Sequence, residues 1–346
     1  MKKPSSISGK QRALEVETEK SCLNNLKMTL TNPQTEIDGY DVPIAFVIFN
    51  RPDVTLLTFQ AIAKARPRKL FLIGDGPRSN RPGEADKVAQ TRAIAQRVDW
   101  PCDVFINFSD VNLGCKNRVS SGISWVFEHA DRAIILEDDC LPSKSFFSYC
   151  REMLILYESD KRVFSISGSN FADQSLQCGH SFSRYSLMWG WATWADRWAE
   201  YILYPTDHVG VTLRTWWNRP IVLAYWLLIF RNLAAGKIDT WDYQWILTVW
   251  RNRALACRPS LNLVKNVGFG ADATHTIIAE SPLAALEAYE TADSCTVCLT
   301  PMVPDGILEQ FDERQWAQIN IRSVLLMTFP WLGPLRASLR ALAAGS

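Results

Sequence analysis

The sequence lacks the features that would place the protein across a membrane or on nucleic acid. Its longest apolar run, residues 221–230, ends at Arg231 and has about half the length that a bilayer span requires. The net charge is +1, from 37 Lys and Arg against 36 Asp and Glu, so no overall positive field favours nucleic acid. We therefore expect neither a transmembrane protein nor a nucleic-acid partner.

A secretory signal and a disulfide framework are also missing. Residues 1–20 are polar and lack the apolar core of a signal peptide. The nine cysteines are scattered and odd in number, so we expect free thiols and a cytoplasmic location. Cys295 and Cys298 form one suggestive pair, but no two further zinc ligands lie near them at suitable spacing. We interpret them as incidental thiols rather than a metal or redox site.

What the sequence does contain is a series of buried-strand patterns. Continuous apolar runs, typical of strands covered on both faces, occur at 44–49, 69–73, 104–108, 133–136 and 163–167. Helical spacing of apolar residues fills gaps between them, for example at 119–130 and 146–157. Strands alternating with helices predict an α/β fold with a mostly parallel sheet flanked by helices. Such sheets bind ligands at the carboxyl ends of their strands.

The pattern also predicts the organisation of the chain. Residues 1–40 are polar without periodicity, and we expect a disordered leader. Residues 41–276 are expected to form a single catalytic domain, in which the Trp-rich stretch 181–275 supplies the acceptor side of a site. Residues 277–346 are expected to form a helical extension.

Three predicted strands end in polar residues at one edge of the sheet. The first runs into Asn50 and Arg51, the second into Asp75, and the fourth into Glu137-Asp138-Asp139. Adjacent carboxylates repel one another unless a cation compensates, and oxygen ligands suit Mg²⁺ or Mn²⁺. A metal ion that binds a nucleotide diphosphate fits this pattern. A strand that ends in a solvated acidic turn would have the same sequence.

The run 134–143 resembles the metal-binding motif of GT-A glycosyltransferases. The closest likeness is to the Glu-Asp-Asp version in the N-acetylglucosaminyltransferase I family and its bacterial relatives. The resemblance continues in order along residues 42 to 276, through the segments 42–52, 74–76, 112–118, 189–194, 241–245 and 268–275. It implies a GT-A, Rossmann-like fold and sugar transfer from a nucleotide-activated donor.

The resemblance also implies roles for individual residues. The implied nucleotide-sugar contacts are Asn50, Arg51, Asp75, Arg118, Glu137, Asp138, Gly190 and Trp191, and the implied metal ligands are Asp139, Asp138 and His275. Plainer interpretations stay open: arginines on the surface or at a helix end, an ordinary turn at Asp75, and tryptophans that pack in the core.

The segment 241–245 resembles the part of the family that carries the catalytic base, which implies that role for Asp242. Its aromatic neighbours Trp241 and Tyr243 favour a raised pKa and so a better base. A helix N-cap is the alternative for Asp242, and Asp239 is a competing base. One base opposite the leaving group implies inversion at the anomeric carbon.

These expectations combine into one reaction. A sugar moves from a nucleotide-diphosphate donor, expected to be a UDP-sugar, to a hydroxyl of a glycan or lipid-linked acceptor, with Mn²⁺ or Mg²⁺ as cofactor. The first alternative is a sugar-phosphate nucleotidyltransferase, which would need a Gly-rich loop after the first strand. Residues 50–53 contain no glycine. The second is a non-catalytic sugar-binding module on the same fold.

The end of the chain has an unusual composition. Residues 315–346 contain no Asp or Glu, but they contain Arg322, Arg336 and Arg340 among Trp, Phe and Leu residues. This composition is typical of segments that bind a membrane surface. A helix packed on the catalytic domain and interrupted at Pro330 and Pro334 is the alternative.

Overall fold

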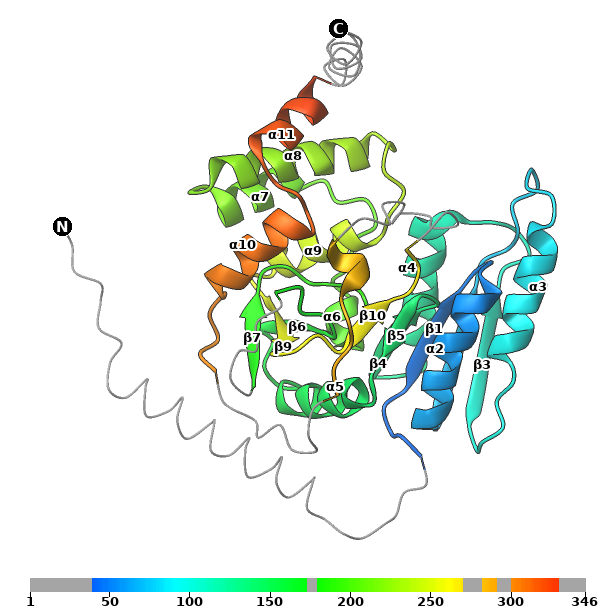
Figure 1. Cartoon of the computed structure of the whole chain (residues 1–346). Helices are drawn as coiled ribbons and strands as arrows, with labels where there is room; N and C mark the ends of the chain where they lie inside the picture. Colours follow the sequence, from blue (N-terminus) through cyan, green and yellow to red (C-terminus); the bar gives the residue numbers. More distant parts are fainter. Residues whose placement is uncertain (1–38, 173–178, 270–281, 291–299, 330–346) are drawn as a thin grey trace, which may run out of the picture.

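The structure is a computed structural model that describes residues 39–172, 179–269, 282–290 and 300–329. Most of the predicted leader therefore lies outside the described residues, as do His275, Cys295 and Cys298. Figure 1 shows a central sheet with helices on both sides and a group of helices at one end. In the part of the chain that is described, no helix has both the length and the apolarity to span a bilayer.

The sheet has eight strands in the order β3-β2-β1-β4-β8-β6-β9-β7. One half is parallel and consists of β3 (Asp103–Phe108), β2 (Lys69–Gly74), β1 (Ile44–Ile48) and β4 (Arg132–Glu137). The other half is mixed and consists of β8 (Trp191–Trp194), β6 (Val163–Ser167), β9 (Leu255–Pro259) and β7 (His180–Ser183). The predicted α/β fold with a mostly parallel sheet is confirmed, and all five predicted strands are present.

Helices cover both faces of the sheet. One face packs against α2 (Pro52–Ala65), α3 (Glu84–Ala95) and α5 (Lys144–Leu156). The other packs against α4 (Gly114–Val126), α7 (His208–Trp216), α8 (Pro220–Ala234) and α9 (Asp242–Arg251). Along β1, Ile44, Phe46 and Ile48 join the first core, and Ala45 and Val47 join the second. Two buried faces explain why β1 reads as a continuous apolar run.

Smaller elements complete the fold. The helix α6 (Ala195–Trp198) follows β8, and β5 (Cys140–Pro142) pairs with β10 (Val264–Asn266) as an antiparallel ribbon. Beyond residue 281, the described chain forms the 3₁₀ helix η1 (Pro282–Ala285), α10 (Gly306–Gln315) and α11 (Ile321–Thr328). α10 packs against β7, and α11 packs against α8.

The segment 189–194 corrects one sequence interpretation. The resemblance implied that Gly190 and Trp191 contact a nucleotide sugar, but the last four residues of the segment form β8, an inner strand hydrogen-bonded between β4 and β6. Its neighbour Gly190 has a φ of 61°, and a Cβ there would lie 2.8 Å from Val264 Cγ2. The glycine is therefore required by close packing against β10 rather than by an open approach to a ligand.

Candidate active site at the carboxyl ends of β1, β2 and β4

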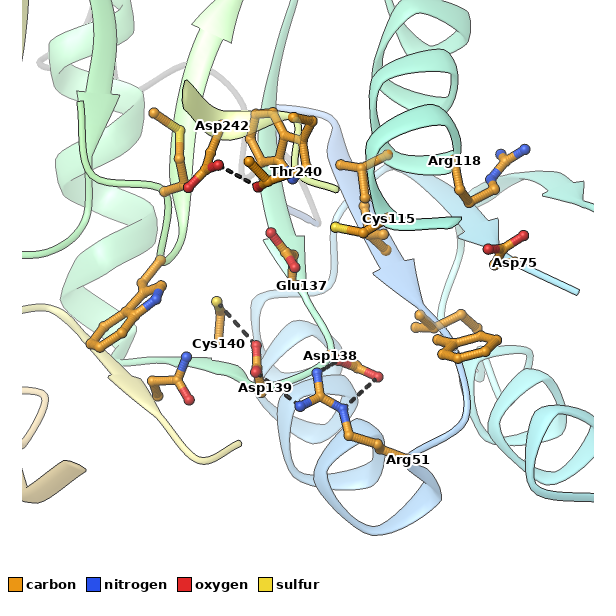
Figure 2. A pocket seen from close by; sticks show the side chains of 18 of the residues that line it. Arg51, Asp75, Cys115, Arg118, Glu137, Asp138, Asp139, Cys140, Thr240 and Asp242 are labelled. Atoms are coloured by element: carbon orange, nitrogen blue, oxygen red, sulfur yellow. Dashed lines mark hydrogen bonds and ion pairs between the residues drawn. The ribbon is translucent and has the colours of Figure 1, made fainter. Parts of the chain in front are cut away.

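A cavity of about 520 Å³ opens where β1, β2 and β4 end. Its walls come from these strand ends, from the first turn of α4, and from residues 239–242 at the start of α9. Because the three strands are parallel, their carboxyl ends meet at one edge, as the sequence predicted. Figure 2 shows the side chains that point into this cavity.

Arg51 holds together two carboxylates at the floor of the cavity. It lies between β1 and α2, and Pro52 begins α2 directly after it, because proline suits the first position of a helix. Its guanidinium forms an ion pair with Asp138 and a second one, 3.1 Å long, with Asp139. Burial opposes its charge, but the two carboxylates raise the pKa of Arg51 above its ordinary value.

Two backbone contacts fix this group in place. Thr58 Oγ1, on α2, donates a 2.9 Å hydrogen bond to the carbonyl of Asp138. Gly268 covers the other side, where a Cβ would lie 2.2 Å from Asp139 Oδ2 and 2.8 Å from Arg51 Nη1. Any side chain at position 268 would displace this ion-pair group, so glycine is needed there.

Glu137, the last residue of β4, projects into the cavity (Figure 2). Its carboxyl group forms no hydrogen bond or ion pair with any other described residue. Burial, with the nearby charges of Asp139 and Asp138, raises the pKa of Glu137 to about 8. Burial likewise raises the pKa of Asp138, although Arg51 opposes the shift. The single guanidinium of Arg51 therefore does not keep all three carboxyl groups ionised near pH 7, and Glu137 is mostly protonated.

A divalent cation would favour the ionised form of these three acidic side chains. Three carboxylates meet one guanidinium, and oxygen donors of this kind suit Mg²⁺ or Mn²⁺. Within the described ranges, no three His, Cys, Asp or Glu side chains converge as a complete metal site. Phosphate oxygens and water would have to complete the coordination, which is the usual arrangement for Mg²⁺.

Asp75 follows β2 and fixes the loop that leads into α4. One oxygen accepts hydrogen bonds from the backbone N–H of Gly76 and Leu113, both 2.9 Å long. The other accepts from Asn112 Nδ2 and from the N–H of Gly114, both at 3.0 Å. Burial raises the pKa of Asp75 despite these bonds. The predicted contact with the nucleotide sugar would have to share an oxygen that already accepts two hydrogen bonds.

The other predicted nucleotide-binding residues have different positions. Arg118, on α4, lines the cavity, and its Nη2 donates to Asn107 Oδ1 at 3.0 Å. Its buried Nε has no partner among the described residues, and burial lowers its pKa. Asn50 is not among the residues that line the cavity, and its Nδ2 instead donates a 2.9 Å hydrogen bond to Glu84 Oε1. Trp191 is fully buried and stacks on Trp241, so packing accounts for it.

Asp242 lies in the wall formed by α9. As the first residue of that helix, its carboxylate benefits from the positive end of the helix dipole. Its Oδ1 accepts hydrogen bonds from Thr240 Oγ1 and, at 2.9 Å, from the N–H of Tyr243. In Figure 2, Glu137 lies between the Asp242–Thr240 pair and the group around Arg51. Asp239 lines the same wall, next to Gly114.

The structure thus brings seven predicted residues to one cavity: Arg51, Asp75, Arg118, Glu137, Asp138, Asp139 and Asp242. Asn50, Gly190 and Trp191 are not among the lining residues. Sequence reasoning missed Cys115, Thr240, Asn266 and Trp316, which line the cavity as well. Thr240 adjoins the predicted base, so its proximity in sequence was a usable signal. Nothing in the sequence connects Trp316 with this site.

Trp316 reaches the cavity because α10 holds the end of the chain against the core. Three acids of α10, Glu309, Asp312 and Glu313, form ion pairs with arginines of the domain. Their partners are Arg184, Arg258 and Arg219, respectively. We call these six residues the α10 latch. Trp316 follows α10 directly and packs against Tyr185.

Comparisons with known proteins add little to this geometry. No protein-family model matches the chain, and no curated protein matches its sequence. One matching solved structure is the mannosyltransferase PcManGT from Pyrobaculum calidifontis, in complex with GDP-Man and Mn²⁺. It is 12% identical with a TM-score of 0.34, and the match covers 68% of this chain and 78% of that one. A likeness this weak says nothing about function.

Proposed function

We propose that the protein is a GT-A glycosyltransferase that moves a sugar from a nucleotide-diphosphate donor to a hydroxyl acceptor. The observation that carries this proposal is the arrangement of the cavity. Three carboxylates compensated by one arginine lie at the carboxyl ends of parallel strands, and a separate carboxylate, Asp242, lies in the opposite wall. The resemblance of the acidic motif to the N-acetylglucosaminyltransferase I family supports the same reaction.

The Arg51 side of the cavity would hold the diphosphate. A divalent cation bound by Asp138 and Asp139, with Glu137 nearby, would supply positive charge that stabilises the departing diphosphate. Arg51 would then contact phosphate oxygens, which match its planar guanidinium. Asp75 and Arg118 mark the end of the cavity next to α4, and we assign the nucleoside to it. The donor proposed here is a UDP-sugar.

The Asp242 side would activate the acceptor. Asp242 takes the proton of the attacking hydroxyl, and the hydrogen bonds from Thr240 and the N–H of Tyr243 orient its carboxylate. A base facing the leaving group directs attack to the opposite face of the anomeric carbon and inverts it. The acceptor is a hydroxyl of a glycan or of a lipid-linked sugar.

A panel of sugar nucleotides tests the proposal. The preferred donor should raise the melting temperature in the presence of Mn²⁺, since a ligand at about 100 times its Kd stabilises the fold by about 2.7 kcal/mol. The same donor should slowly release nucleoside diphosphate when only water is available as acceptor. Release of pyrophosphate from a nucleoside triphosphate and sugar phosphate would identify a nucleotidyltransferase instead. Binding of sugars without release of any nucleotide would identify a binding module.

A further inference from the structure

Three stretches of more than 25 residues contain no acidic residue, namely 208–238, 243–271 and 315–346, and the first and third share one feature of the fold. Residues 208–238 and 315–346 include none of the 36 Asp and Glu. Their basic residues are Arg214, Arg219, Arg231 and Lys237 in residues 208–238 and Arg322, Arg336 and Arg340 in residues 315–346. In a chain with a net charge of +1, these stretches are locally basic.

The fold brings two of these stretches together. Residues 208–238 form α7 and α8, and the described part of residues 315–346 includes α11. α8 packs against both α7 and α11, and Figure 1 shows the three helices together at one end of the molecule. We call them the acid-free layer. Segments separated by more than 80 residues in the sequence thus build one basic region.

The acid-free layer exposes apolar side chains to an unusual degree. Along α7, Val209 and Leu213 are 49% and 44% exposed at helical spacing, and Trp217, just beyond the helix, is 76% exposed. On α11, Ile321 and Leu325 are 62% and 45% exposed, and the helix has no fully buried residue. A helix on a water-facing surface normally places polar residues on its outer side.

α8, the central helix of the layer, is apolar around its whole circumference. Its inner side buries Trp226 and Phe230 in the core. Its other side carries Leu223, Leu227 and Leu228, which are only half-buried. A helix that is apolar all round is usually covered on all sides, and here α7 and α11 cover this side of α8 only in part.

Exposed basic side chains lie on the same segments as these apolar side chains. Arg214, Arg231, Lys237 and Arg322 are exposed. Arg219 is the exception, because its guanidinium pairs with Glu313 of the α10 latch. Exposed Trp and Leu together with exposed cations are the combination that binds anionic lipid headgroups and the adjoining acyl chains.

We propose that the acid-free layer docks the protein on the surface of a membrane that contains anionic lipid. Charge complementarity decides between a bilayer and a second copy of the chain. In a symmetric dimer, the same acid-free, basic helices would face one another, and their like charges would repel. An anionic bilayer neutralises them and receives the exposed Trp217 and Leu325 in its interfacial region.

Docking also affects the cavity, if the proposed sugar transfer is correct. Trp316 lines the cavity, and α11 begins five residues later at Ile321. The cavity wall and the docking layer are therefore almost continuous in the chain. A hydroxyl acceptor carried on a lipid would reach the cavity from the bound membrane.

Vesicle binding by the full-length chain tests the docking proposal without reference to catalysis. The probes are vesicles of phosphatidylcholine alone and of phosphatidylcholine with an equal amount of phosphatidylglycerol. Wild-type protein should sediment only with the anionic vesicles, and added salt should weaken the binding. Leu325→Glu should weaken it about tenfold or more, because it places a charge in the interfacial region.

Leu57→Glu is the matched control, since Leu57 is also 45% exposed on a helix, but on α2 at a distance from the layer. It should bind like wild type. For charge, Arg231→Glu should reduce binding, whereas Arg97→Glu, an exposed arginine after α3, should not. Denaturant unfolding of each variant shows whether the fold is retained.

Three results would overturn the proposal. One is the absence of wild-type sedimentation with anionic vesicles. Another is equal loss of binding in Leu325→Glu and Leu57→Glu. The third is a wild-type dimer in solution that Leu325→Glu dissociates while vesicle binding is absent, which would make a second copy the occupant. None of these results bears on donor binding, so the proposed reaction is tested separately.

Discussion

Two groups of three carboxylates lie in this molecule, and they differ in how their charges are balanced. In the α10 latch, Glu309, Asp312 and Glu313 each have an arginine of their own. In the cavity, Glu137, Asp138 and Asp139 share Arg51, and Glu137 has no partner among the described residues. Removal of one partner from a balanced buried pair leaves an uncompensated charge and destabilises the fold, whereas an unbalanced group can be completed by a cationic ligand.

The largest effect should come from breaking the most buried pair of the latch. Arg258 and Asp312 are both fully buried, and Arg258→Met would leave the Asp312 charge without its partner. We expect the free energy of unfolding to fall by about 3–5 kcal/mol, measured by denaturant titration. Arg258→Met combined with Asp312→Leu should recover most of the loss. A double variant as unstable as the single one would show that the pair is not the cause.

The next effect concerns catalysis in the cavity. Asp242→Asn should lower turnover by about 10²- to 10⁴-fold while donor affinity is retained, because the amide accepts no proton from the acceptor hydroxyl. Asp239→Asn, in the same wall, should leave turnover close to that of wild type. The opposite pattern in steady-state kinetics would transfer the role of base to Asp239.

A matched pair of substitutions contrasts the two groups directly. Glu309→Gln should lower the free energy of unfolding by about 1–3 kcal/mol, since Glu309 accepts hydrogen bonds from the side chain and the backbone N–H of Arg184. Glu137→Gln replaces a carboxyl that is mostly protonated near pH 7 with an amide of similar shape, so it should change the free energy of unfolding by less than about 1 kcal/mol. Destabilisation of equal size by both substitutions would remove the distinction between the groups.

The smallest effect should appear as a dependence on pH near the latch. His180 lies in β7, the strand against which α10 packs, and burial lowers its pKa to about 4. In the unfolded chain the His180 imidazole is protonated as the pH falls below about 6.5, whereas in the folded chain it stays neutral down to about pH 4. The contribution to stability is therefore complete above about pH 6.5 and is lost as the pH falls towards 4.

Replacing the histidine checks this dependence. In His180→Gln, the free energy of unfolding should vary less between pH 6.5 and pH 4 than in wild type. His208→Gln is the control for loss of an imidazole elsewhere in the chain. Identical pH profiles for His180→Gln and wild type would show that this group does not contribute.

Sequence reasoning located three strands of the parallel half because both of their faces are buried, whereas the expectation that residues 104–108 are covered on both faces was wrong, since β3 is an edge strand with Val104 and Ile106 exposed. β1, β2 and β4 are apolar at almost every position, and their polar ends marked the site. β8 was missed because Trp191–Trp194 contains two tryptophans and follows a glycine, a pattern that favours a loop. Only its pairing with β4 and β6, which are distant in sequence, makes it a strand.

The α10 latch could not be predicted for a similar reason. Acids on a short helix are usually solvated, and their burial here depends on arginines from three distant segments. Trp316 reaches the cavity only as a consequence of that docking. Local sequence patterns therefore predicted the acids at the strand ends. They could not predict the α10 latch or the position of Trp316, because these depend on contacts between segments that are distant in sequence.

Calorimetry of UDP binding tests the central claim, that the cavity carboxylates are reserved for a ligand, most directly. Wild-type protein should bind UDP in the presence of Mn²⁺ and much more weakly without it. Asp139→Asn should lose the Mn²⁺-dependent part and unfold at the same denaturant concentration as wild type, while Asp53→Asn, at an exposed site on α2, should bind normally. Unchanged Mn²⁺-dependent affinity in Asp139→Asn would contradict the account.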